Sequence, residues 1–271
     1  MKPRPFDYLR PDTIEETVAL LAEYGEDARV LAGGQSLVPM LNLRLIEADA
    51  LIDISQIAAL DVISDRGDKI EIGAAVTQNK LLAWPQLAEK LPLLAAALPH
   101  VGHFQTRNKG TVCGSIAHAD PSSELPLALA LLGGEIVLKS KRGERVLAAA
   151  DFHMDMLTTA RAGDELITSV RFPAGKGAGV AFREVARRHG DFAIIAVAAV
   201  AEDKHVRLGV GGMAGRPLVR RIAMDKAAEA IAAWADELEG YEDLHASAAM
   251  RRDLFRNLAP RVVEEAIRCA V

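Results

Sequence analysis

Cysteine is scarce in this sequence, which has two such residues, Cys113 and Cys269, in a chain of 271. Two thiols cannot build a disulfide framework, and they cannot supply the cysteine ligands of a protein-held iron–sulfur cluster. Redox chemistry on this chain would therefore require an organic cofactor. We predict that Cys113 is a buried thiol that packs as a small hydrophobic side chain.

Long apolar runs and an excess of positive charge are also missing. No stretch approaches the roughly 18 apolar residues that span a bilayer, and the N-terminal MKPRPFDYLRPD has no apolar core of a secretory signal. The net charge of −5 and the pI near 5.8 provide no general attraction to nucleic acid or to anionic membranes. We therefore expect a cytoplasmic chain without membrane insertion and without a nucleic-acid partner.

Two stretches rich in glycine and small residues stand out, at 30–45 and 110–126. In the first, Gly33 and Gly34 follow a short apolar run and can adopt positive φ, so that successive N–H groups converge on an anion. An ordinary turn would also contain glycines. The second, GTVCGSIAHADPSSELP, has little hydrophobic periodicity, and we interpret it as a second loop of the same kind.

The N-terminal part reads as a β-α-β unit. Thr13 and Glu16 fit a capping box at the start of a helix that stops at Gly25. Further patterns predict strands at 6–9, 29–32 and 50–54 and a short helix at 37–43. The first glycine stretch therefore follows a strand, where α/β folds place ligands.

The remaining patterns divide the chain into a mixed middle part and a C-terminal part. They predict, in order, a strand at 69–75, helices at 77–82, 87–97 and 126–132, a hairpin over 135–147 and a strand at 165–172. A glycine-rich segment at 175–179 marks a boundary. After it we expect three antiparallel strands, at 179–187, 193–201 and 206–212, and two helices, at 225–240 and 247–269.

Three motifs in this order carry a family resemblance: LAGGQSLVPMLNLRL, TVCGSIAHADPSSELP and ARRHGDFAI. Over essentially its whole length the chain resembles the FAD-binding medium subunit of molybdenum-containing hydroxylases, the family of carbon monoxide dehydrogenase, with the flavin domain of xanthine dehydrogenase as a more distant relative. The resemblance implies an α+β protein with a p-cresol methylhydroxylase-type FAD-binding fold. It implies two α+β FAD-binding subdomains, 1–56 and 57–173, followed by a C-terminal domain, 174–271, with a three-stranded antiparallel sheet and helices.

The resemblance also implies where FAD is bound. The first loop would wrap the pyrophosphate with backbone N–H groups and the Ser36 hydroxyl, and the second would approach it from the other side. Ile167 would contact the adenine side, and Phe192 would lie near the isoalloxazine ring. The complete implied set is Leu31, Ala32, Gly33, Gly34, Gln35, Ser36, Leu37, Val101, Thr111, Gly114, Ser115, Ala117, His118, Asp120, Ser123, Glu124, Ile167, Arg183 and Phe192.

Several of these residues have a structural alternative. Phe192 fits a core strand equally well, His118 could cap a helix, and Asp120 precedes Pro121 as a common turn initiator does. Ser115 stands where many relatives have asparagine, and Cys113 where they commonly have glycine. His100 and His103 could suggest a metal site or covalent flavin attachment, but no third ligand stands at metal spacing, and we predict no metal ligand and no catalytic acid or base.

The function implied by the resemblance is electron transfer within a complex. A molybdopterin-binding large subunit would oxidise the substrate, a small subunit would carry [2Fe-2S] centres, and FAD on this chain would pass electrons to an external acceptor such as a quinone, oxygen or NAD. Two alternatives stay open: a self-contained flavin oxidase, and a non-catalytic assembly subunit of the same fold.

Overall fold

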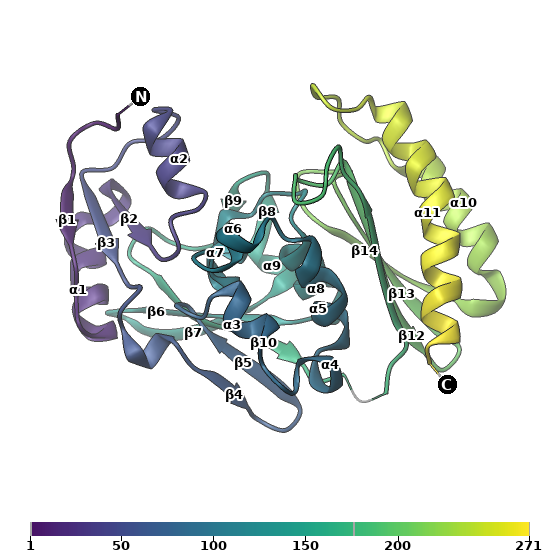
Figure 1. Ribbon diagram of the computed structural model, residues 1–271, viewed down its shortest axis with the longest axis horizontal. Helices are drawn as coiled ribbons and strands as arrows, with labels where there is room; N and C mark the ends of the chain where they lie inside the picture. The colour runs from purple at the N-terminus through teal and green to yellow at the C-terminus, as the bar shows by residue number, and fades with distance from the viewer. Residues whose placement is uncertain (1, 176, 271) are drawn as a thin grey trace.

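The computed structural model describes residues 2–175 and 177–270. It contains three main sheets arranged one after another along the longest axis of the molecule (Figure 1). The N-terminal sheet has the order β1-β3-β2 and is parallel throughout. Its strands and the helices joined to them are β1 (Asp7–Leu9), α1 (Ile14–Tyr24), β2 (Ala28–Leu31), α2 (Leu37–Asn42) and β3 (Ala50–Asp53). The predicted β-α-β arrangement is confirmed.

The start of α1 is fixed by side-chain caps. The Thr13 hydroxyl accepts a hydrogen bond from the Glu16 N–H at 3.1 Å, while the Glu16 carboxylate accepts from the N–H of Asp12 at 2.8 Å. The return bond of the predicted capping box therefore comes from the residue before the cap. Gly25, with φ of +54°, ends the helix as expected.

The middle sheet is antiparallel and has the order β4-β5-β10-β6-β7. Its strands are β4 (Ile63–Asp65), β5 (Lys69–Gly73), β6 (Glu135–Ser140), β7 (Gly143–Ala148) and β10 (Leu166–Pro173). A short ribbon, β8 with β9, accompanies it (His153–Asp155, Thr158–Thr159). Its helices are α3 (Gln78–Leu82), α4 (Leu87–Lys90), α5 (Pro92–Ala97), α6 (Phe104–Arg107), α7 (Val112–His118), α8 (Glu124–Leu132) and α9 (Ala149–Phe152).

The interpretation of the second glycine stretch as a loop was wrong for its first part. Residues 112–118 form the helix α7, with Thr111 as its N-cap. The reason is tertiary: Val112, Cys113 and Ile116 are buried and hold the segment against the sheet, although its glycine and serine lower helix propensity. α7 ends at Ala119 in the left-handed conformation.

The C-terminal sheet has four antiparallel strands, not the three that were expected. The strand missed is β14 (Leu218–Ala223), which pairs with β13 at the sheet edge. Its sequence LVRRIA has one fully buried side chain, Ile222, so no alternating apolar pattern marks it. The other elements are β11 (Val180–Val185), β12 (Ile195–Glu202), β13 (His205–Gly211), α10 (Ala227–Glu237) and α11 (Ala248–Arg268).

β12 is buried on both faces. Ala196, Ala198 and Val200 belong to the core shared with the middle sheet and α8, whereas Ile195 and Val197 belong to a second core under α10 and α11. Figure 1 shows the same layering, with α5 and α8 on one side of this sheet and α10 and α11 on the other. The division at 173/174 into separate domains stays a prediction, and the boundary segment includes Lys176, which lies outside the described residues.

Among the described residues, no helix combines the length and the apolar character needed to cross a membrane.

Candidate cofactor-binding cleft

A cleft of about 710 Å³ is lined by residues of the N-terminal unit, the middle unit and the segment before β12. This volume lies in the range of small-molecule and cofactor sites, roughly 300–1,000 Å³. Both glycine stretches contribute to the lining. The predicted site residues that line it are Ala32, Gly33, Gly34, Gln35, Ser36, Leu37, Val101, Thr111, Gly114, Ser115, Ala117, His118, Ser123, Glu124, Ile167 and Phe192.

The two glycines of the first loop have different tasks. Gly34 has φ of +69°, a conformation that side chains with a Cβ rarely adopt. Gly33 allows close approach, because a Cβ there would lie 2.1 Å from the carbonyl oxygen of Lys109 and 2.7 Å from the Cα of Gly110. The loop after β2 is thereby pressed against the segment that leads into α7.

The first loop presents a run of free donors. Within the described chain, the N–H groups of residues 33–37 donate to no protein acceptor. Converging backbone N–H groups of this kind suit phosphate oxygens and need no lysine. Gln78 adds a buried side-chain oxygen, Oε1, that lines the cleft and has no partner among the described residues.

The start of α7 forms the facing wall. The Thr111 hydroxyl accepts from the Gly114 N–H at 2.9 Å, and a Cβ on Gly114 would lie 2.8 Å from that hydroxyl oxygen, so a side chain there would have to displace the cap. Cys113 is buried, its thiol lies 3.5 Å from the carbonyl oxygen of Ile72, and burial raises its pKa well above the usual range. The prediction of an inert, packed thiol is confirmed.

Two titratable groups line the wall beside α7 and α8. Burial, assisted by the charge of Asp120, raises the pKa of Glu124 to about 7. Burial also lowers the pKa of His118, against the opposing effect of Asp120. Asp120 itself does not line the cleft, and its carboxylate accepts from the Ser122 N–H at 2.8 Å, as a turn initiator does. Near neutral pH, His118 is therefore mostly neutral and Glu124 is only partly ionised.

Four further predictions have clear structural outcomes. Phe192 is 58% exposed and lines the cleft, so its alternative as a core strand residue was wrong. Arg183 is not brought to the cleft: it pairs with Glu265 of α11 at 2.8 Å. Leu31 ends β2 next to the loop but is absent from the lining. His100 and His103 also lie outside the lining, and His100 Nδ1 is 3.3 Å from a carboxylate oxygen of Glu184.

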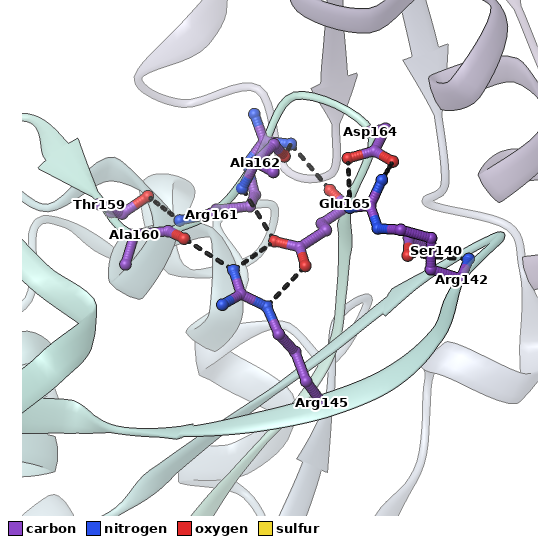
Figure 2. A network of polar contacts seen from close by, with 9 residues as sticks. All are labelled: Ser140, Arg142, Arg145, Thr159, Ala160, Arg161, Ala162, Asp164 and Glu165. Carbon is purple, nitrogen blue, oxygen red and sulfur yellow. Dashed lines mark hydrogen bonds and ion pairs between the residues drawn. The ribbon is translucent and has the colours of Figure 1, made fainter.

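The far wall contains polar residues that sequence reasoning missed. Figure 2 shows how the loop before β10 is held: Arg145 makes a two-pronged contact with Glu165 at 2.6 and 2.7 Å, and Glu165 accepts from the Ala162 N–H at 2.8 Å. Arg161 and Glu165 both line the cleft, and Arg29 joins them from β2. No local pattern singles these residues out, because the segments that meet at this wall lie far apart in the sequence.

Comparisons with known proteins agree with this arrangement. Residues 4–175 match the family described as the FAD binding domain in molybdopterin dehydrogenase. The chain is 33% identical to the carbon monoxide dehydrogenase medium chain of Hydrogenophaga pseudoflava, with 100% of both chains covered. It is 35% identical to the nicotine 6-hydroxylase medium subunit of Paenarthrobacter nicotinovorans, covering 98% of this chain and 99% of that one.

Solved structures give the same result for the fold. The carbon monoxide dehydrogenase structure from Hydrogenophaga pseudoflava superposes with a TM-score of 0.94 at 31% identity, covering 100% of both chains. Quinoline 2-oxidoreductase from Pseudomonas putida 86 superposes with a TM-score of 0.93 at 32% identity, covering 100% of this chain and 99% of the other.

The fold and the cleft thus define an FAD-binding α+β protein. Within that class, the chain belongs to the family of FAD-binding medium subunits of molybdenum hydroxylases, to which the medium chain of carbon monoxide dehydrogenase also belongs. The family resemblance carried by the sequence motifs is confirmed.

Proposed function

We propose that FAD lies in the cleft and passes electrons from [2Fe-2S] centres on a small subunit to an external acceptor, while substrate is oxidised on a molybdopterin-binding large subunit. The observation that supports the site most directly is the run of unpaired N–H groups at residues 33–37, opposite α7. These donors would bind the pyrophosphate. The naming of relatives as a medium chain and as a subunit of a dehydrogenase complex supports the assembly.

The work of this chain is binding, orientation and shielding. Redox chemistry is supplied by FAD when it is bound. The N–H run and Ser36 would hold the phosphates. Glu124, whose pKa burial raises to about 7, and His118, whose pKa burial lowers, would face the sugar portion. Phe192 would cover the flavin end. Among the described residues, no two titratable side chains of the cleft lining are hydrogen-bonded to each other, so we assign no proton transfer to a side chain.

The acceptor stays open among a quinone, oxygen and NAD. A self-contained flavin oxidase would turn over substrate as an isolated chain, and an assembly subunit would not bind FAD. Two relatives that match over essentially the full length are named as a medium subunit and a medium chain, which favours the electron-transfer subunit over both alternatives.

The test is titration of the purified, FAD-free chain with FAD, followed by flavin fluorescence and by the thermal midpoint. An FAD concentration 100 times Kd should stabilise the folded chain by about 2.7 kcal/mol. Gly34→Val should abolish saturable binding, because the loop depends on φ of +69° at this glycine.

Gly67→Val is the matched control. Gly67 also has positive φ, of +90°, but lies in the β4–β5 turn with open space around it, so this variant should bind FAD normally despite some backbone strain. Failure of the wild-type chain to bind FAD, both alone and with co-purified partner subunits, would contradict the proposal.

A further inference from the structure

Arg161 is a partly buried cation in the cleft wall that has no carboxylate partner. Its Nη1 donates to the carbonyl oxygens of Ala162, Gly163 and Glu165 at 3.0, 3.3 and 2.7 Å. In the described part of the chain it forms no ion pair, and its Nε and Nη2 have no acceptor. Glu26, Glu165 and Asp164 act on this charge only from a distance, so the partly desolvated Nε and Nη2 donors lack an acceptor and an electron-rich ligand group is expected beside them.

The loop that carries Arg161 is preorganised. Glu165 is clamped by Arg145 and by the Ala162 N–H, and Asp164 is paired with Arg142 on the neighbouring hairpin (Figure 2). The carbonyl oxygens that orient Arg161 belong to this clamped loop. Its free donors are therefore held in place before any ligand arrives, which lowers the entropy cost of binding.

The position of Arg161 is at the end of the cleft opposite Phe192. The Arg161 neighbourhood includes Arg29 and Glu26 from the N-terminal unit. Phe192 comes from the segment between β11 and β12 of the C-terminal sheet, whereas β2 lies in the N-terminal sheet, on the other side of the middle unit in Figure 1. The anion loop at 33–37 follows β2 and packs on Gly110, between these two ends.

We propose that Arg161 contacts the adenosine half of FAD and is the residue by which the cleft distinguishes FAD from FMN. This inference rests on the proposed function. With the pyrophosphate at residues 33–37 and the isoalloxazine beside Phe192, the adenosine reaches the Arg161 end. A planar guanidinium can stack on the adenine ring or donate to its ring nitrogens and to the ribose, and FMN lacks this half of the molecule.

The experiment compares three probes on the FAD-free chain: FAD, FMN and ADP, which carries the adenosine half and the pyrophosphate without flavin. Arg161→Met keeps an unbranched apolar stem and removes the guanidinium. Affinity for FAD and for ADP should each fall about tenfold or more, the scale of one lost charged hydrogen bond, while affinity for FMN should change less than about twofold.

Arg66→Met is the control, since Arg66 is an exposed arginine of the β4–β5 turn that pairs with Glu71 at 3.7 Å and neither holds this loop nor lines the cleft. It should leave all three affinities unchanged. Arg161→Lys keeps the charge without the planar group and should recover only part of the loss.

An equal loss of affinity for FMN and for FAD would overturn the inference, because the substitution would then have disturbed the structure of the cleft and not a contact with adenosine. Unchanged binding of FAD and ADP would overturn it as well. Failure of the proposed function has a different signature: the wild-type chain itself would bind neither FAD nor ADP.

Discussion

Replacing Gly33 with alanine tests whether the cleft depends on contact between its two walls. The new Cβ would lie 2.1 Å from the Lys109 carbonyl oxygen, and ordinary contact begins at 3.4 Å, so the two backbones must separate by 3.4 − 2.1 = 1.3 Å. Neither neighbour is a flexible side chain. Gln78 follows the movement, since its N–H donates to the Gly110 carbonyl at 2.8 Å.

The Gly33→Ala substitution overpacks this contact, and an inserted group in a tight contact lowers the free energy of unfolding by about 1–3 kcal/mol. Alanine stabilises relative to glycine by about 0.4–1 kcal/mol through the unfolded chain, which leaves a net loss of about 1–2 kcal/mol in the free energy of unfolding. Because the N–H run moves away from α7, we also expect FAD affinity to fall about tenfold, since a shift of about 1 Å in a positioned site is costly.

Urea unfolding of the FAD-free chain and an FAD titration measure the two effects. Gly67→Ala provides the control, because a Cβ there meets nothing within 4 Å and its φ of +90° introduces only local strain. It should lose some stability and no FAD affinity. A Gly33→Ala chain with wild-type stability and wild-type affinity would refute the packing of these two segments.

Two further predictions concern buried charged groups. Burial and the charge of Glu124 raise the pKa of Glu184 to about 8. The folded chain therefore keeps a proton that the unfolded chain loses near pH 4.5. The stability that this group contributes falls as the pH rises between those two values. Glu184→Gln should therefore gain stability relative to wild type from pH 5 to pH 8 in urea unfolding, and parallel curves would contradict this. Arg251 is 1% exposed, donates to the carbonyls of Ile194 and Gly212, and pairs with Asp243 at 2.6 Å. Arg251→Met should cost about 3 kcal/mol in the same assay, whereas Arg261→Met, on the exposed side of the same helix, should change stability by less than about 0.5 kcal/mol.

The N-terminal unit was predictable because its signals are local. A threonine cap, a glycine stop and short apolar strands are each encoded within a few residues, and the structure places them as expected. α7 was missed because its burial is decided by the middle sheet, and β14 was missed because a largely exposed edge strand needs only one inward side chain.

The lining residues of the cleft were predictable where they belong to a sequence motif, and the others were not. The glycine loop and most of the second motif line the cleft as the family resemblance implied. Arg161, Arg29 and Gln78 come from single positions whose role depends on contacts between distant segments. The packing role of Gly33 was also not predictable, because no pattern in the neighbouring sequence indicates its close approach to Lys109.

The C-terminal unit holds in place a segment that lines the cleft. Because β12 contributes one face to the core of the middle unit and the other to the core under α10 and α11, its position is fixed from both sides. The segment just before it carries Phe192 and ends at Ile194, whose carbonyl is held by Arg251 of α11. Gly190 in the same segment packs directly on His103. The Phe192 side chain, which we propose covers the flavin, is thus positioned by a helix near the C-terminus, so substitutions in α11 far from the cleft should alter the environment of bound flavin before they alter FAD affinity.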